Sequence, residues 1–135
     1  MIPKNVLDRF WKRVKKSNKC WIWEGAGHSR TNHGMFGYNY QGRNITLYCH
    51  RVSYQQLIGE IPKGLVLDHL CSNPRCVNPT HLEPVTIGEN VRRAKAKQTH
   101  CKRGHSLKEN AYINKKNGHR TCRKCNNYRN QQRAK

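Results

Sequence analysis

The spacing of cysteine and histidine residues constrains the fold of this 135-residue chain more than any other feature. The chain carries 7 cysteines and 8 histidines. Several of them occur as C-x4-C, C-x3-H and C-x2-C, spacings typical of zinc ligands rather than of a disulfide framework. Hydrophobic residues make up only 35% of the chain, and small domains with thin cores usually need metals or disulfides to fold. The sequence therefore predicts a small protein stabilised by metal.

The first predicted zinc site lies in the middle of the chain. Cys71, Cys76 and His81 fall within eleven residues. A closed structural zinc site has four ligands, and Cys20 and Cys49 are the candidates for the remaining position. A disulfide between Cys71 and Cys76 is the alternative, which the expected reducing setting disfavours.

The second predicted zinc site occupies the C-terminal region. Cys101 and His105 form a C-x3-H pair, and Cys122 and Cys125 form a C-x2-C pair. Residues 98–135 are otherwise polar and basic, so little besides metal would hold them together. We expect residues 98–135 to form a separate basic zinc module after a core domain at 1–97, giving two structural Zn²⁺ ions per chain.

The charge of the chain predicts a polyanionic partner. Lys and Arg number 27 against 7 Asp and Glu, a net charge of +20, which points to nucleic acid rather than to a merely solvated basic face. No signal peptide, membrane span or amphipathic membrane helix stands out, so we expect a cytoplasmic protein that does not bind membranes. The basic side chains predicted to contact DNA are Arg43, Arg92, Arg93, Lys102, Arg103, Arg120, Arg123 and Lys124.

Apolar periodicity and turn residues predict short helices and strands. We expect an amphipathic helix over 5–16 with Asn5 as its N-cap, and a strand over 20–24. Two strands over 35–48 are expected to form a hairpin, which either reads the major groove or is a plain surface hairpin. Further along, the sequence predicts a helix over 50–58, a strand over 65–67, an irregular proline-rich segment, and a helix over 87–97 capped by Thr86.

An acid beside a histidine suggests catalysis in this basic chain. A histidine side chain has its unperturbed pKa near neutrality, so His69 could act as a general base that activates water. Asp68 and Asn90 offer hard oxygen ligands of the kind that Mg²⁺ or Mn²⁺ prefers. Neighbouring strand residues point to opposite faces, so Asp68 and His69 would need a bend to converge on one phosphate. The alternative is that this pair only stabilises the loop.

The segment from Asp68 to Asn90 resembles the HNH, or ββα-metal, nucleases. In that family a strand ends in Asp-His, a loop follows, and a helix carries an Asn or His metal ligand. The cysteines, in HLCxNxxCxNPxHL from His69 to Leu82, are similar to the His-Cys box homing endonucleases. Further resemblance to phage and bacterial HNH proteins lies in Arg9-Phe10-Trp11, Cys20-Trp21-Ile22-Trp23, Phe36-Gly37-Tyr38 and His50-Arg51.

The resemblance implies roles for residues that spacing alone leaves open. It favours Cys20 as the fourth ligand of the first zinc site, leaving Cys49 a buried thiol. It implies that His81 binds zinc, although a role for His81 as a catalytic metal ligand stays open. Asn78 is expected to order backbone. His50 could orient the site, contact phosphate or simply pack, whereas His28, His33, His100 and His119 are expected to face solvent or DNA.

The resulting prediction is an α+β, zinc-stabilised ββα-metal core with an N-terminal helix, a hairpin and a C-terminal zinc module. Such a protein would be a metal-dependent endonuclease with His69, Asp68 and Asn90 at its catalytic site. One alternative is a zinc protein that binds nucleic acid without cutting it. Another is an interaction module of a phage packaging or antirestriction complex. A monomer and a homodimer are both compatible with the sequence, since one site cuts one strand per event.

Overall fold

The N-terminal helix α1 (Lys4–Trp11) is shorter than predicted. In this computed structural model, which describes all 135 residues, α1 follows Pro3, whose carbonyl accepts hydrogen bonds from two backbone N–H groups of the first turn. The prediction that Asn5 caps the helix was therefore wrong. The predicted helix over 5–16 also extended too far. Its last residues include β1 (Val14–Lys15), which pairs antiparallel with β2 (Ile22–Trp23). Pairing between strands has overridden helical periodicity here.

An aromatic cluster forms the core of the first part of the chain. The ring of Phe10 stacks on that of Trp23, with centroids 5.2 Å apart, and meets Phe36 edge-on at 5.5 Å. All three side chains are at most 3% exposed. Aromatic pairs of this geometry contribute about 0.5–1.5 kcal/mol each beyond the area that they bury. These contacts join α1, β2 and the following strand, which carries Phe36, around one core.

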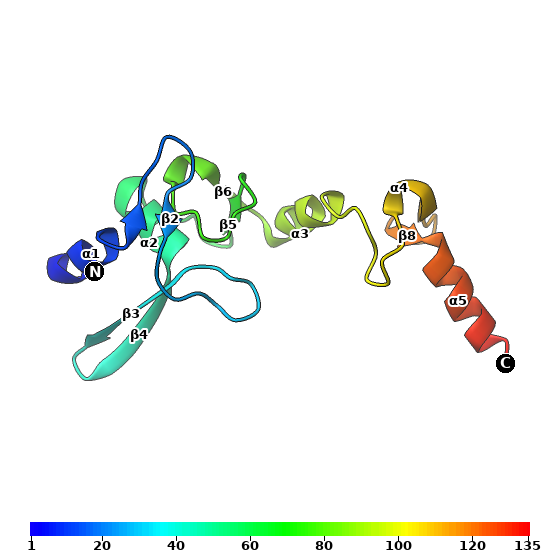
Figure 1. Cartoon of the computed structure of the whole chain (residues 1–135), viewed down its shortest axis with the longest axis horizontal. Helices are drawn as coiled ribbons and strands as arrows, with labels where there is room; N and C mark the ends of the chain where they lie inside the picture. The colour runs from blue at the N-terminus through cyan, green and yellow to red at the C-terminus, as the bar shows by residue number, and fades with distance from the viewer. The chain divides into compact units, whose positions relative to one another are not determined.

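A long hairpin, β3 (Met35–Tyr40) and β4 (Arg43–Tyr48), follows as predicted. Its register pairs Tyr40 with Arg43, so the turn consists of Gln41 and Gly42 alone. Both turn residues have positive φ, 50° and 75°, as a two-residue turn that matches strand twist requires. In Figure 1 the hairpin projects from the rest of its unit.

The next elements carry the predicted site. Helix α2 (Cys49–Leu57) leads to β5 (Val66–His69). A 3-10 turn, η1 (Pro79–His81), comes directly before β6 (Leu82–Val85), which pairs antiparallel with β5. Helix α3 (Ile87–Ala96) follows. Strand β6 was missed, because its Pro84 argued for irregular structure. Proline is tolerated here because each strand of a two-stranded sheet is an edge strand.

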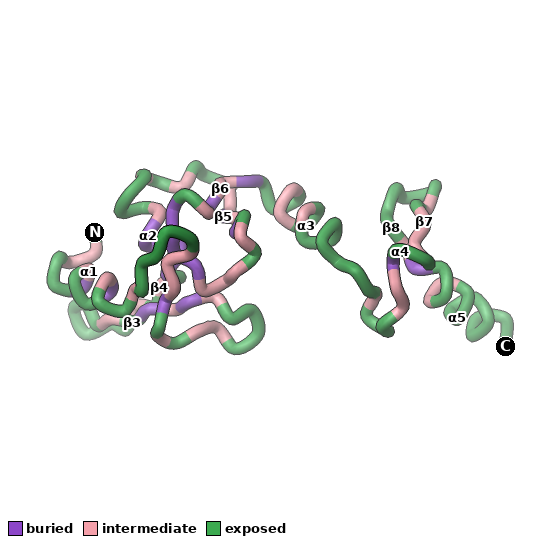
Figure 2. The backbone as a smooth tube through the Cα atoms, turned by 45° about the horizontal axis from the view of Figure 1, so that its top comes forward, coloured by how far each residue is buried: buried purple, intermediate pink, exposed green.

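The C-terminal elements are short and form around the second Cys/His group. They are α4 (Leu107–Asn110), the paired strands β7 (Ala111–Ile113) and β8 (Arg120–Cys122), and α5 (Arg123–Arg133). Only Leu107 and Cys122 are buried in this region. Figure 2 shows the contrast, with buried segments concentrated in the N-terminal part of the chain.

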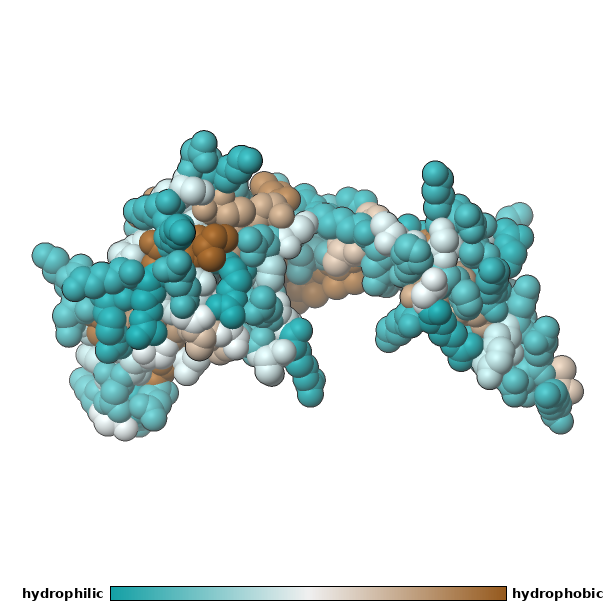
Figure 3. All heavy atoms as spheres, viewed as in Figure 1, coloured by the Kyte–Doolittle hydropathy of each residue, from teal (hydrophilic) through white to brown (hydrophobic).

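The chain divides into two units, Met1–Asn90 and Val91–Lys135, with the division inside α3. Mixed helices and short hairpins with two Cys/His groups confirm the predicted α+β class. Hydrophilic residues dominate the face drawn in Figure 3, as the composition implies. None of the helices combines the length and the apolar character that crossing a bilayer requires.

Candidate functional site

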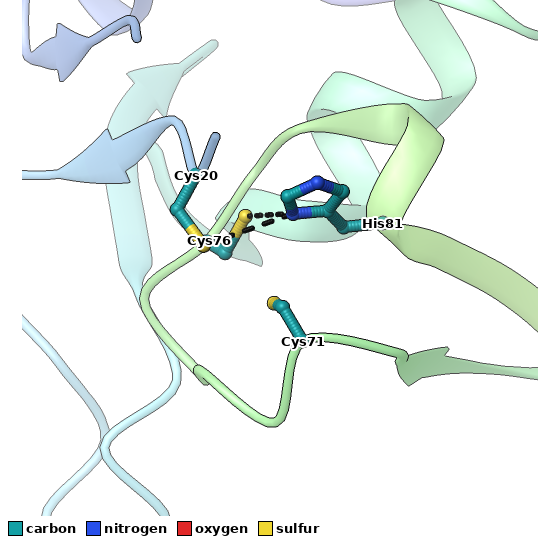
Figure 4. A group of neighbouring side chains, drawn as sticks. All are labelled: Cys20, Cys71, Cys76 and His81. Atoms are coloured by element: carbon teal, nitrogen blue, oxygen red, sulfur yellow. Dashed lines mark hydrogen bonds between the residues drawn. The ribbon is translucent and has the colours of Figure 1, made fainter. Parts of the chain in front are cut away.

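The first Cys/His group brings together Cys20, Cys71, Cys76 and His81, whose ligand atoms all lie within 4.8 Å of one another. Nδ1 of His81 is 3.7 Å from the sulfur of Cys20 and 3.5 Å from that of Cys76. A tetrahedral zinc ion would separate sulfur from nitrogen by roughly 3.6 Å and two sulfurs by roughly 3.8 Å, given its usual bond lengths. The four side chains point toward one another in Figure 4. Their spacing therefore fits a structural zinc ion.

Cys20 and Cys49 occupy different environments. Cys20 lies just before β2 and its sulfur faces His81, whereas Cys49 begins α2 and packs in the aromatic core with no exposed surface. Burial raises the pKa of the Cys49 thiol to about 12. Cys20 therefore completes the first Cys/His group, whereas Cys49 lies outside it as a side chain of the core.

The second group, Cys101, His105, Cys122 and Cys125, has the same composition and the same spread of ligand atoms, within 4.8 Å. Its sulfur–nitrogen distances to Nδ1 of His105 are 3.4, 3.6 and 3.4 Å, and the sulfurs of Cys101 and Cys125 lie 3.6 Å apart. These values again match the edges of a zinc tetrahedron. Both groups could hold zinc.

Asn78 forms hydrogen bonds that order the backbone on either side of the first Cys/His group, near His81 and near Cys20. Its side-chain oxygen accepts hydrogen bonds from the N–H and the hydroxyl of Thr80, at 3.1 and 2.8 Å, and so caps η1. Its amide nitrogen donates to the carbonyl of Lys19 at 2.8 Å. Asn78 therefore ties the turn that carries His81 to the segment that carries Cys20.

His69 is held by the same loop. Its Nε2 lies 3.1 Å from the backbone carbonyl of Cys76, and the ring is only 7% exposed. A carbonyl can only accept, so Nε2 carries the proton and Nδ1 keeps its lone pair. Burial and then the charge of His33 hold the pKa of His69 below its usual value, while the Cys76 carbonyl and Asp68 act in the opposite direction.

Asp68 directly precedes His69 in β5, whereas Asn90 lies in α3. Pairing of β5 with β6 continues through both Asp68 and His69, so the strand has no bend between them. Burial alternates accordingly, with His69 on the buried face and Asp68 on the more open one. Asn90 is half-buried in the first turn of α3, where its N–H donates to the carbonyl of Thr86.

Sequence reasoning missed a group of three histidines. His33, expected to face solvent or DNA, lies with its ring centroid 5.3 Å from His69 and 5.2 Å from His50. His50 and His69 are 4.8 Å apart. Burial, followed by the charges of His69, His33 and Arg51, lowers the pKa of His50 to about 3, and its Nδ1 is buried without a hydrogen-bond partner. No sequence spacing links these residues, which come from a loop, a helix and a strand.

The basic side chains predicted to contact DNA are mostly exposed. Arg43 lies at the tip of the β3–β4 hairpin, and Lys102 and Lys124 are exposed in the second unit. Arg103 and Arg123 lie over the rings of Tyr128 and Tyr112, at 4.3 and 5.4 Å. Arg120 has a structural contact as well, because it donates to the carbonyls of Lys95 and Gln98. On α3, Arg92 is exposed and Arg93 is half-buried.

A strand ending in Asp-His, an antiparallel partner strand and a helix bearing Asn90, braced by a Cys/His group, define a domain of the ββα-metal class. The family model described as HNH endonuclease matches residues 47–92, which span α2 through the first half of α3. The chain belongs to the HNH endonuclease family.

The similar proteins come from phages. Protein 2.8 of Escherichia phage T7 is 36% identical over 86 residues, covering 63% of this chain and 56% of that protein. Protein 7.7 of the same phage is 36% identical over 72 residues, covering 53% and 51%. The uncharacterized gene 5.3 protein of Enterobacteria phage T3 is 30% identical over 70 residues, covering 49% and 69%. The chain thus spans about half the length of the two T7 proteins. No solved structure matches it.

Proposed function

We propose that this protein is a metal-dependent endonuclease that hydrolyses phosphodiester bonds in DNA. The observation that carries the proposal is the hydrogen bond between Nε2 of His69 and the carbonyl of Cys76. That bond fixes the tautomer whose Nδ1 has a free lone pair, which is the form that a general base needs. The zinc-type loop thereby orients the base before substrate arrives.

His69 is the residue that takes the proton from the attacking water. Its lowered pKa keeps it unprotonated at neutral pH. Its buried ring is held by Cys76 and flanked by His33 and His50, so little rotational freedom is lost on binding. Release of the proton to solvent completes its part in the reaction.

Asp68 and Asn90 are the residues that would hold a divalent ion. A carboxylate and an amide carbonyl suit Mg²⁺ or Mn²⁺. Such an ion, when bound, offsets negative charge on the phosphate and on the leaving 3′ oxygen. Water and leaving group lie on opposite sides of phosphorus in an in-line displacement. The base and the ion-holding residues therefore need not share one face of β5.

The basic residues of both units supply affinity for DNA. The net charge of +20 favours a polyanion strongly, and contacts from Lys and Arg to phosphates carry no sequence information by themselves. Arg43, Arg92, Arg93, Lys102, Arg103, Arg120, Arg123 and Lys124 are the proposed contacts. The two Cys/His groups, each holding Zn²⁺, serve as braces rather than as reacting centres.

The proposal is tested by cleavage of supercoiled plasmid in Mg²⁺ or Mn²⁺. We expect His69→Ala to reduce the rate by at least about 100-fold, the usual lower bound for removing a general base. His119→Ala, which changes an exposed histidine of the second unit, is the matched control and should cut as the unchanged protein does. Equal rates for His69→Ala and the unchanged protein would rule out the mechanism. Binding without any cleavage by the unchanged protein would favour a non-catalytic nucleic-acid-binding protein.

A further inference from the structure

The group of three histidines contains a side chain that the proposed mechanism does not use. His33, His50 and His69 form a triangle with ring centroids 4.8–5.3 Å apart. His50 and His69 are 8% and 7% exposed, whereas His33 is half-buried. His33 is thus the member of the triangle through which solvent, or a ligand, meets the group most readily.

The loop that carries His33 is fixed to the loop that carries Cys76. Arg75 donates from Nε and Nη2 to the side-chain oxygen of Asn32, at 3.1 and 2.9 Å, and from Nη1 to the carbonyl of Gly25. Within the loop, the N–H of His28 donates to the carbonyl of His33 at 2.8 Å. The position of His33 is therefore set by the same segment that orients His69.

Close packing also fixes the other side of His33. A Cβ atom at the next residue, Gly34, would lie 2.7 Å from Cδ1 of Trp23 and 3.2 Å from Cβ of Cys49. Only glycine lets the chain pass this close to the aromatic core. The N–H of Cys49 donates to the Gly34 carbonyl at 2.9 Å. The backbone that carries His33 is consequently fixed on both sides, and its ring contacts those of His50 and His69, an arrangement that preorganises a catalytic group.

We propose that His33 is a catalytic residue whose imidazole N–H donates a hydrogen bond to a non-bridging oxygen of the phosphate that is cleaved. The inference rests on the proposed nuclease function and adds a second histidine to its site. His50 is a positioning residue, which packs beneath both rings. A preorganised donor aimed at an oxygen that gains charge in the transition state is the kind of group that accelerates acyl and phosphoryl transfer.

The electrostatic surroundings of His33 are consistent with that role. The titratable side chains around it are His28, Tyr48, His50 and His69. Burial and then His28 lower the pKa of His33, so the ring is neutral at pH 7. A neutral imidazole offers one N–H donor to phosphate and leaves proton abstraction to His69.

Two substitutions at His33 separate a hydrogen-bond donor from a packing role. His33→Phe keeps an aromatic ring against His50 and His69 but has no N–H, whereas His33→Gln keeps a donor. We expect His33→Phe to lower the rate of plasmid nicking at saturating protein by about 10- to 100-fold, somewhat below the effect of losing an oxyanion donor. Its half-saturating protein concentration should stay within about twofold, and His33→Gln should recover part of the rate.

A neighbouring histidine supplies the matched control. Nδ1 of His28 accepts from the N–H groups of Arg30 and Thr31 at 3.3 and 3.4 Å, so His28→Asn keeps an acceptor for the loop and should nick as the unchanged protein does. Asn32→Ala, which removes the contact with Arg75, should resemble His33→Phe. Melting temperature and zinc content, measured for every variant, show whether the fold is intact.

The possible outcomes distinguish this inference from the proposed function. If His69→Ala is inactive while His33→Phe nicks within about threefold of the unchanged protein, the role of His33 is refuted and the nuclease function stands. If His69→Ala nicks normally, the general-base role of His69 fails, and if the unchanged protein does not nick at all, the proposed nuclease function itself fails. Loss of a bound metal ion from folded His33→Phe would assign His33 to a metal site and overturn the phosphate contact.

Discussion

The two Cys/His groups of this chain have the same ligands but different surroundings. The group in the first unit adjoins an aromatic core, in which Phe10 and Trp23 are at most 1% exposed. The group in the second unit has only Leu107 and its own Cys122 as buried side chains. Hydrophobic burial can therefore stabilise the first unit besides any metal that its Cys/His group holds, whereas the second unit would depend on metal.

The two Cys/His groups also differ in the residues that they position. In the first unit, the loop that provides Cys76 also orients His69 and, through Arg75, the loop of His33. In the second unit, the ligands are interleaved with exposed basic residues such as Lys102 and Lys124. Under the proposed function, the first group would support the catalytic histidines, and the second would support a charged surface. Substitutions in each unit can test this contrast.

The largest expected effect is the unfolding of the second unit when one of its ligands is removed. Cys122→Ser should unfold residues 91–135, because a structural zinc ion contributes an apparent free energy of about 10–16 kcal/mol to modules of this kind. Amide hydrogen exchange should show reduced protection in β7, β8 and α5, and metal analysis should show one zinc fewer per chain.

Cys76→Ser in the first unit is the matched comparison for Cys122→Ser. Because the aromatic core remains, we expect protection to persist in α1 and β3 of this variant even as its cleavage activity falls. Persistent protection of the second unit in metal-free Cys122→Ser protein would contradict the contrast between the units.

A smaller effect is expected from a cavity in the aromatic core. Phe10→Ala should reduce the free energy of unfolding of the first unit by about 3–5 kcal/mol, through reduced burial and the cavity left behind. Thermal denaturation followed by tryptophan fluorescence measures it, since all 3 tryptophans lie in the first unit. Tyr128→Ala, at a position 46% exposed in α5, should reduce the free energy of unfolding of the second unit by less than about 1 kcal/mol. Amide hydrogen exchange in α5 measures this effect, because the second unit has no tryptophan. A destabilisation as large as that of Phe10→Ala would mean that the second unit has a core of its own.

The smallest effect concerns the charged surface. Replacing Lys102 and Lys124 by alanine should weaken DNA binding and reduce the slope of log affinity against log salt by about 1 for each phosphate that the protein no longer neutralises. Fluorescence anisotropy with a labelled duplex at several salt concentrations gives this slope. The doubly substituted Lys102→Arg, Lys124→Arg protein keeps both charges and should keep the slope. An unchanged slope in the alanine protein would remove these residues from the interface.

Local patterns predicted much of the fold. The hairpin over 35–48 and the helix after Thr86 were found because alternation, turn residues and a capping threonine act over a few positions. The errors came from contacts between distant segments. Val14 continues an apolar helical face in sequence, yet Val14 and Lys15 pair with β2. Strand β6 was hidden by Pro84, whose missing N–H matters little at a sheet edge.

The candidate site was predictable to the extent that its parts are adjacent in sequence. Asp68 directly precedes His69, and the spacing of Cys71, Cys76 and His81 is itself a signal. His50 was singled out only through the resemblance of His50-Arg51 to HNH proteins, and His33 carries no comparable pattern, because only the packing of a loop against α2 and β5 brings it to His69. The partner of Nε2 of His69 was equally hidden, since it is a backbone oxygen.

That backbone oxygen has a consequence for how substitutions at Cys76 are read. The residue contributes its sulfur to the Cys/His group and its carbonyl to His69. Every amino acid has a backbone carbonyl, so substitutions at this position change the thiol but keep the carbonyl. A survey of tolerated substitutions would therefore detect the requirement for the thiol and not the requirement for the carbonyl. The constraint on the oxygen would surface only at neighbouring positions, as intolerance of changes that shift the peptide plane.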